Sequence, residues 1–182
     1  MANSICVYCG SNPGNDPAFA LAAREFGQLL ALGGRTLVFG GGRVGLMGTL
    51  ADAALAAGGR VIGVIPEKLA AKELAHLGLT ELHRVPSMHE RKALMAERSD
   101  AFVALPGGLG TLDELFEAWT WSQLGFQRKP IGLLNVKGFF DPLVEFVRQS
   151  AASGFVNQGA LDLVAVDDDA ERLIERLDAM GG

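Results

Sequence analysis

The segment from residue 101 to residue 119 constrains the fold of this chain more than any other. It begins with five consecutive apolar residues, 101–105, a run typical of a strand buried in a parallel sheet. Its second half carries apolar side chains at the i, i+3, i+4, i+7 spacing of an amphipathic helix, namely Leu112, Leu115, Phe116 and Trp119. The segment therefore predicts a strand followed by a helix, with a tight turn between them.

The turn between this strand and this helix, residues 106–111, contains three glycines. Glycine has no Cβ, so the backbone can turn sharply and approach a ligand closely. The free N–H groups of such a loop and of the following helix start favour an anion. Glu114 lies one turn inside that helix. The pattern predicts a phosphate-binding loop with a carboxylate beside it, suited to chemistry on a phosphorylated small molecule.

Thr111 and Glu114 also fit a second interpretation. Threonine followed three residues later by glutamate is the pattern of a capping box, which satisfies the orphan amides of a helix start. On this interpretation Glu114 is structural and the glycines only make a tight turn. The segment by itself does not decide between the two interpretations.

Apolar runs and amphipathic segments alternate about seven times along the chain. We expect strands over residues 4–8, 36–39, 60–65, 82–85, 101–105, 130–136 and 163–166. Helices are expected over 17–32, 87–98 and 168–180, from the loop 40–48 to residues 58–59, from the loop 106–111 to residue 125, and from residue 141 onward. Residues 67–80 predict one short helix and a loop. Strands apolar on both faces and separated by amphipathic helices indicate a doubly wound α/β parallel sheet with helices on both faces. Because the sequence contains no repeat or linker, we expect one domain over residues 1–182.

Three loops of this predicted sheet are rich in glycine: 9–14, 40–48 and 106–111. Ligands of open parallel sheets bind at the carboxyl ends of the strands, so all three loops should meet at one edge. Residues 40–45 match the G-x-G-x-x-G dinucleotide pattern. However, this pattern follows the second strand, and the acidic residue near the end of the next strand is only Glu67, beyond a proline. The loops therefore favour a nucleotide monophosphate or a sugar phosphate.

The predicted helix 87–98 carries two adjacent cations. Ser87 and Glu90 form a capping box at its start, and Met88, Arg91, Lys92 and Met95 share one face. One interpretation is a methionine core stripe with the cations reaching out to solvent. The other is that the inward cations need an anionic partner, because an unpaired buried charge is costly. We favour the second interpretation, with Glu114 and a bound phosphate as the partners.

Composition and spacing exclude several classes of protein. The net charge of −5 gives no general attraction to nucleic acid or to anionic membranes. The first residues lack the basic region of a secretory signal and no apolar run approaches the length of a membrane span, so we expect a cytoplasmic protein. We expect Cys6 and Cys9 to be free thiols in a strand. The three histidines have no metal-ligand spacing and no serine lies in a G-x-S-x-G elbow, so no metal and no serine hydrolase are expected.

The sequence from 106 to 114 is the motif P-G-G-x-G-T-x-x-E. Together with Met-His-Glu-Arg-Lys at 88–92 and the glycine-rich residues 40–48, it closely resembles the LONELY GUY (LOG) family, the cytokinin riboside 5′-monophosphate phosphoribohydrolases often mislabelled as lysine decarboxylases. The resemblance implies a Rossmann-like domain, a homodimer with active sites near the interface, and no cofactor. It also implies cleavage of the N-glycosidic bond of an N6-modified AMP, giving the free base and ribose 5-phosphate.

The resemblance further implies a set of site residues. Arg91 and Glu114 match the catalytic pair of the family. The expected substrate contacts are these two residues with Ser11, Gly41, Gly42, Gly45, Met47, Glu73, Met88, Lys92, Pro106, Gly107, Gly108, Leu109, Gly110, Thr111, Leu112, Asp113 and Thr120. Two rivals stand beside this hypothesis. A pyridoxal-phosphate decarboxylase needs a partnered lysine, which the sequence does not indicate, and a non-catalytic nucleotide sensor could use the same loops.

Overall fold

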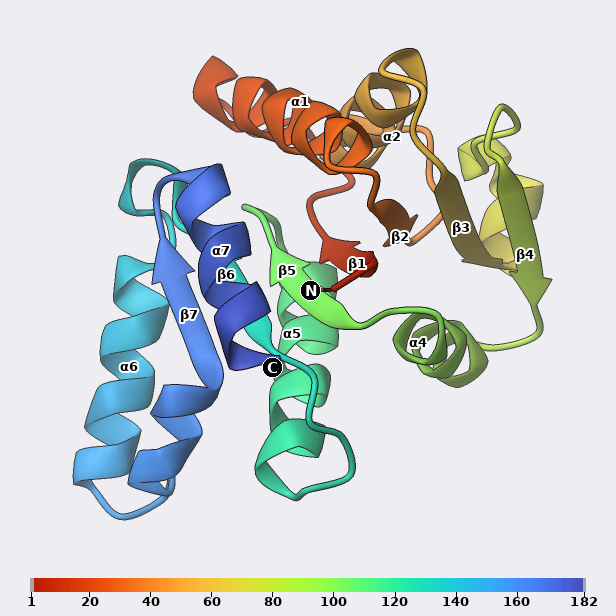
Figure 1. The fold of residues 1–182 in the computed structure, drawn as a ribbon. Helices are drawn as coiled ribbons and strands as arrows, with labels where there is room; N and C mark the ends of the chain where they lie inside the picture. The colour runs from red at the N-terminus through yellow and green to blue at the C-terminus, as the bar shows by residue number, and fades with distance from the viewer. Residues whose placement is uncertain (1, 182) are drawn as a thin grey trace.

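The structure is a computed structural model that describes residues 2–181, apart from the side chains of residues 72 and 73. Within this part of the chain, seven strands form one parallel sheet in the order β4-β3-β2-β1-β5-β6-β7 (Figure 1). The strands are β1 (Ser4–Tyr8), β2 (Thr36–Phe39), β3 (Val61–Pro66), β4 (Glu81–Val85), β5 (Ala101–Ala104), β6 (Ile131–Leu134) and β7 (Val164–Asp167). The predicted parallel α/β sheet is confirmed.

Helices connect the strands and cover the sheet. They are α1 (Pro17–Leu32), α2 (Gly45–Ala56), α3 (Glu67–Leu69), α4 (Met88–Glu97), α5 (Leu109–Gln123), α6 (Asp141–Ala152) and α7 (Ala170–Met180). Short turns of other helix types also occur: η1 (Ala70–Leu74) is a π-helical turn, whereas η2 (Val136–Gly138) and η3 (Gln158–Leu163) are 3₁₀ turns. The segment for which only a short helix and a loop were predicted therefore contains α3 and η1.

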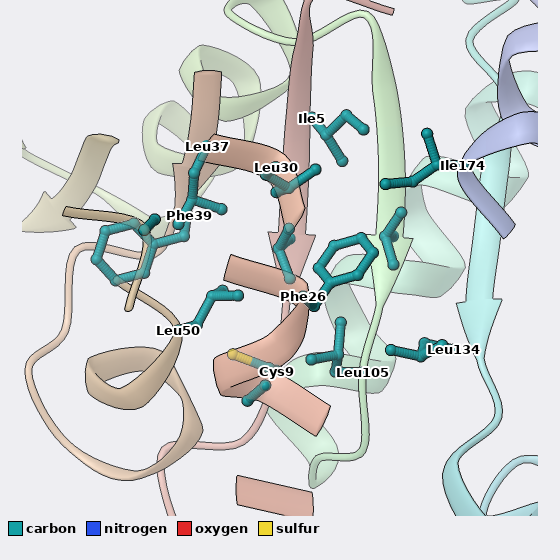
Figure 2. Packing of buried hydrophobic residues seen from close by; sticks show 14 of the residues in the cluster. Ile5, Cys9, Phe26, Leu30, Leu37, Phe39, Leu50, Leu105, Leu134 and Ile174 are labelled. Atoms are coloured by element: carbon teal, nitrogen blue, oxygen red, sulfur yellow. The ribbon is translucent and has the colours of Figure 1, made fainter. Parts of the chain in front are cut away.

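The core has two halves, one on each face of the sheet. Successive residues of a strand point to opposite faces, so Ile5 and Val7 of β1 belong to one half and Cys6 and Tyr8 to the other. The first half packs against α1, α2 and α7, as Figure 2 shows for buried residues from these elements. The second half packs against α4, α5 and α6. Burial on both faces explains why the central strands are almost wholly apolar.

Strand β1 lies at the point where the direction of winding reverses. It pairs with β2 on one side and with β5 on the other. The loops after β1 and β5 therefore diverge from neighbouring strands, and the crevice between them is the usual ligand site of such a sheet.

Two further predictions concern the thiols and the membrane. Cys6 and Cys9 are buried free thiols, as predicted. Among the helices of the described residues, none has both the length and the apolar character needed to cross a bilayer.

Candidate active site

A cavity of about 680 Å³ opens where the three glycine-rich loops meet. Its walls come from residues 9–15 after β1, from residues between 40 and 47 after β2, and from residues between 106 and 114 after β5. The predicted convergence of these loops is therefore confirmed. Because the cavity lies at the carboxyl edge beside the switch point, it is the candidate active site.

The loop after β5 lies against the loop after β1 so closely that residue 107 has no room for a side chain. A Cβ at Gly107 would lie 2.1 Å from Oγ1 of Thr111 and 2.9 Å from the backbone nitrogen of Gly10. The Gly10 N–H donates to the Pro106 carbonyl at 3.1 Å. Packing alone therefore requires glycine at 107, whatever ligand the loop binds.

Helix α5 begins before the position that the capping-box interpretation assigns to its start. Its N-cap is Gly108, which has no side chain, and Thr111 lies in the first turn. Glu114 is buried and faces Arg91. Of the two interpretations that the segment left open, the capping box at Thr111 is therefore wrong. The N–H groups at this helix start have no side-chain acceptor, so the end of the helix favours an anion.

The start of α2 is a second helix end without a side-chain cap at the same cavity. Gly45 has a φ of 61°, and a Cβ there would lie 2.3 Å from the carbonyl carbon of Ser11. Glycine adopts this conformation without steric cost, whereas a Cβ at this position would meet the backbone of Ser11. The Leu46 N–H donates to the Gly10 carbonyl at 3.0 Å and so joins the loops after β1 and β2.

Arg91 and Glu114 form a buried ion pair at the cavity. Nη1 of Arg91 lies 3.0 Å from Oε1 of Glu114, and the two side chains are 10% and 8% exposed. The other guanidinium nitrogens are held by strand ends: Nε donates to the Val64 carbonyl at 3.1 Å and Nη2 to the Gly40 carbonyl at 3.2 Å. These carbonyls orient the guanidinium so that its third nitrogen meets the carboxylate.

The surroundings of this pair change its protonation equilibria. Burial raises the pKa of the Glu114 carboxyl, and the Arg91 guanidinium lowers it. The charge of Asp113 raises this pKa further, so that its net shift is upward. A carboxyl with a raised pKa and a specific charge partner in a cavity is typical of a functional site. Burial also raises the pKa of the Cys9 thiol, so this cavity residue stays protonated and is not an activated nucleophile.

Helix α4 begins at the predicted N-cap, Ser87, and the structure shows the serine half of the predicted capping box. The Glu90 N–H donates to Oγ of Ser87 at 3.2 Å, and the Ser87 hydroxyl donates to Oε1 of Glu90 at 3.0 Å. Lys92 points away from the cavity. Its ammonium lies 3.1 Å from Oδ2 of Asp113 and also contacts the carboxylate of Glu117. Arg91 and Lys92 thus have anionic partners on α5, but they are different partners.

The cavity wall contains many of the predicted contact positions: Ser11, Gly42, Met47, Arg91, Pro106, Gly107, Gly108, Leu109, Gly110, Thr111 and Glu114. Other predicted positions lie outside this wall: Gly41, Gly45, Met88, Lys92, Leu112, Asp113 and Thr120. Sδ of Met88 is 4.0 Å from Nη1 of Arg91, but Met88 and Thr120 are both exposed. The side chain of Glu73 lies outside the described residues.

Sequence analysis did not identify the apolar part of the wall, which consists of Phe19, Ile65, Leu69, Leu74 and Phe139 together with apolar residues of the glycine-rich loops. Ile65 could have been inferred, because it ends a predicted strand. The others carry no motif. They reach the cavity from α1, from the segment after β3 and from the loop after β6, which only the tertiary structure brings together.

Comparison with known proteins identifies the family. Residues 47–177 match the family described as "Possible lysine decarboxylase". The chain is 50% identical over 172 residues to the cytokinin riboside 5′-monophosphate phosphoribohydrolase of Rhodococcoides fascians, covering 94% of this chain and 87% of that protein. The chain belongs to the LOG family. The LOG protein of Oryza sativa subsp. japonica is 46% identical over 174 residues, which cover 96% of this chain and 72% of that protein.

Solved structures agree with the fold of this LOG-family chain. The molybdenum cofactor binding protein from Rippkaea orientalis has a TM-score of 0.73 and 26% identity, covering 97% of this chain and 96% of that one. The Moco carrier protein from Chlamydomonas reinhardtii has the same TM-score and coverage at 24% identity, a similarity that shows the fold alone. The LOG resemblance predicted from residues 40–48, 88–92 and 106–114 is confirmed.

Proposed function

We propose that this LOG-family enzyme hydrolyses the N-glycosidic bond of cytokinin riboside 5′-monophosphates, which are AMP derivatives modified at N6. The products are the free base and ribose 5-phosphate, and plain AMP is a second candidate substrate. One observation carries the proposal: the buried pair of Arg91 and Glu114 borders the same cavity as a glycine-rich helix start without a side-chain cap. We take residues 1–182 as a single nucleotide-monophosphate-binding domain.

The start of α5 supplies the proposed phosphate site. The N–H groups of Leu109, Gly110 and Thr111 precede the first intrahelical hydrogen bond, so no carbonyl of the helix accepts them. The partial positive charge of this helix end favours the 5′-phosphate. Binding energy gained at the phosphate, remote from the reacting bond, then orients the ribose toward Glu114.

The buried carboxylate supplies the proposed chemistry. As the C1′–N9 bond breaks, its electrons go to the base and positive charge develops at C1′, which an ionised Glu114 stabilises. A water oxygen then bonds to C1′, and the proton that the water loses balances the proton taken up by the base. Glu114 orients this water, and Arg91 favours the ionised carboxylate by opposing the effect of burial on its pKa.

Replacement of Glu114 by glutamine tests the proposal, because it removes the charge and keeps the shape. We expect Glu114→Gln to lower base release from N6-isopentenyl-AMP by at least about 100-fold, as for other preorganised electrostatic groups. Glu97→Gln, an exposed glutamate on α4, is the matched control. Released base is quantified by chromatography, and thermal melting checks folding. Full turnover in folded Glu114→Gln would refute the role of the carboxylate.

The same assay separates the rival functions. A nucleotide sensor would bind N6-isopentenyl-AMP and AMP without releasing base from either. A pyridoxal-phosphate decarboxylase needs a lysine at its reaction site, but no lysine described by the structure lines the cavity. The buried Arg91–Glu114 pair has no role in either rival, which favours the hydrolase.

We also propose a homodimer with its active sites near the interface, in the cytoplasm. Large apolar side chains are exposed on α5 and just after it: Phe116 is 37%, Leu124 60% and Phe126 77% exposed. Such exposure supports a partner surface. The exposed Met88 and Thr120, predicted substrate contacts outside the cavity wall, fit a site completed by a second copy. Reduced free thiols support the cytoplasmic location. Light scattering of Leu124→Glu and of the unmodified chain tests the dimer.

A further inference from the structure

The cavity has apolar walls at both of its ends. One wall consists of Met47 in α2, Ile65 in β3, and Leu69 and Leu74 in the segment that follows β3. The other belongs to the elements that follow β1 and β6. It contains Phe19 and Phe139, whose rings meet edge to face with centroids 5.7 Å apart. A nucleotide held in this cavity can direct its base toward only one of these walls.

The order of the strands decides which wall the base meets. The proposed phosphate site lies at the loops after β1 and β5, whereas the Arg91 guanidinium is bonded to the carbonyls of Gly40 after β2 and Val64 in β3. Along the sheet edge these strands follow one another in the order β3, β2, β1, β5, β6 (Figure 1). The Arg91 guanidinium, which is paired with Glu114 of α5, lies on the β2 and β3 side of the phosphate site, whereas Phe139 of the aromatic wall follows β6 on the other side.

A ribose 5-phosphate has its phosphate and its anomeric carbon at opposite ends. With the phosphate at the start of α5 and C1′ beside Glu114, the base leaves the ribose in the direction of β3. The apolar cavity residues on that side of the sheet are Met47, Ile65, Leu69 and Leu74. Contact distances support this neighbourhood: an added Cβ at Gly40 would lie 1.8 Å from Nη2 of Arg91 and 3.3 Å from Sδ of Met47.

The far side of this wall is held in place by the glycine-rich loop after β2. The Arg43 N–H donates to the Leu74 carbonyl at 2.8 Å, and the His76 N–H donates to the Gly41 carbonyl at 2.9 Å. Gly42 and Ala75 form an isolated antiparallel bridge. The segment that carries Leu69 and Leu74 is thus fixed against the loop that borders Arg91, and both leucine side chains are only partly buried. Partly buried aliphatic side chains that line a cavity can gain burial when an apolar ligand group enters.

We propose that Leu69 and Leu74 receive the N6 substituent of the base and determine how strongly the enzyme prefers N6-modified AMP over plain AMP. This inference rests on the proposed function, because it takes the phosphate site and the catalytic pair as its two fixed points. An aliphatic substituent such as isopentenyl matches the aliphatic wall, whereas plain adenine leaves the two leucines uncovered. The aromatic wall of Phe19 and Phe139 has no part in this selectivity.

The test compares two substrates in parallel. kcat/KM is measured for N6-isopentenyl-AMP and for AMP with the unmodified enzyme, Leu69→Ala, Leu74→Ala and the control Phe139→Ala at the opposite wall. Loss of a few methyl groups from an apolar pocket lowers discrimination by about tenfold or more. We expect the ratio of the two kcat/KM values to fall by that factor in each leucine variant. In Phe139→Ala the ratio should stay within about threefold of the unmodified enzyme, the usual scatter of such comparisons.

Further variants distinguish lost contacts from misfolding, and a binding assay tests the inference separately from the proposed function. Leu69→Met and Leu74→Met, which conserve volume, should restore the ratio if truncation rather than misfolding is responsible. An unchanged ratio in both alanine variants, with base still released, overturns the inference and leaves the proposed function intact. A ratio that falls in Phe139→Ala instead assigns the base to the other wall. If the unmodified protein releases no base, the proposed function fails, and the Kd ratio of the two nucleotides in the same variants decides the inference.

Discussion

Replacement of Gly40 by alanine should displace Arg91, the proposed catalytic arginine, without changing either member of the Arg91–Glu114 pair. A Cβ at residue 40 would lie 1.8 Å from Nη2 of Arg91, where ordinary van der Waals contact begins at 3.4 Å. The backbone of Gly40 is not among those with a positive φ, so alanine is compatible with the chain itself. The guanidinium must therefore withdraw from the Gly40 carbonyl and from its position beside Glu114.

The size of the effect follows from this displacement. Misplacement of a catalytic group by about 1 Å costs about 100-fold in rate, or about 2.7 kcal/mol. Overpacking in a tightly packed interior costs about 1–3 kcal/mol of the free energy of unfolding. In a chain of this length that corresponds to a fall in Tm of about 2–12 °C. We expect Gly40→Ala to be folded, less stable and about 100-fold slower in releasing base.

The assay measures released base with N6-isopentenyl-AMP and AMP, alongside thermal melting of the same samples. Gly159→Ala is the matched control, because a Cβ there comes no closer than 3.6 Å to its nearest neighbour and the residue lies outside the cavity. Unchanged turnover and unchanged Tm in Gly40→Ala would show that Arg91 is not held against the end of β2, or that its position does not matter for the reaction. Either result would refute the reasoning.

Four further predictions follow from the site. Activity should fall as the pH drops through a value above 4.5, because burial raises the pKa of the Glu114 carboxyl and the reaction needs it ionised. In Arg91→Gln the opposing charge is gone, so the acid limb of the residual kcat/KM–pH profile should move to higher pH. Lys92→Met should lower the free energy of unfolding in urea by about 1.5–3 kcal/mol, since two carboxylates lose their partner. A KM raised more than tenfold in the same variant would show that Lys92 also contacts the substrate. Gly45→Ala should destabilise the protein by about 3 kcal/mol or more, seen as a loss of Tm, because φ is positive and the Cβ meets the Ser11 carbonyl.

Local sequence patterns were reliable where the structure they predict is itself local. The Asp16–Pro17 start of α1 is present, with the Ala18 N–H donating to Oδ1 of Asp16 at 2.9 Å, and the helix ends at Leu32 before two glycines. The predicted N-cap at Ser87 is also present, with the Glu90 N–H donating to its hydroxyl. In these cases the residues that interact are within a few positions of one another, so the pattern contains both partners.

The same kind of pattern was wrong at Thr111. Threonine and glutamate three residues apart occur there as they do at a capping box, but the glycine turn starts the helix earlier and Glu114 has a stronger partner. That partner, Arg91, comes from a different helix. A short sequence window cannot show that a distant cation competes for a side chain, so the local pattern could not distinguish a structural glutamate from a site residue.

The amino-acid sequence by itself determined the parallel α/β sheet, the three glycine-rich loops at one edge and the family to which the chain belongs. Only the tertiary structure decided the orientation of the Arg91 guanidinium, because the carbonyls that accept its hydrogen bonds lie 27 and 51 positions away in the chain. It also decided that Lys92 pairs with carboxylates other than Glu114. Likewise, only the fold brings leucines and phenylalanines from separate elements together as walls of one cavity. The physical reason is range: periodicity and capping depend on near neighbours, whereas the orientation of a buried charge depends on every element packed around it.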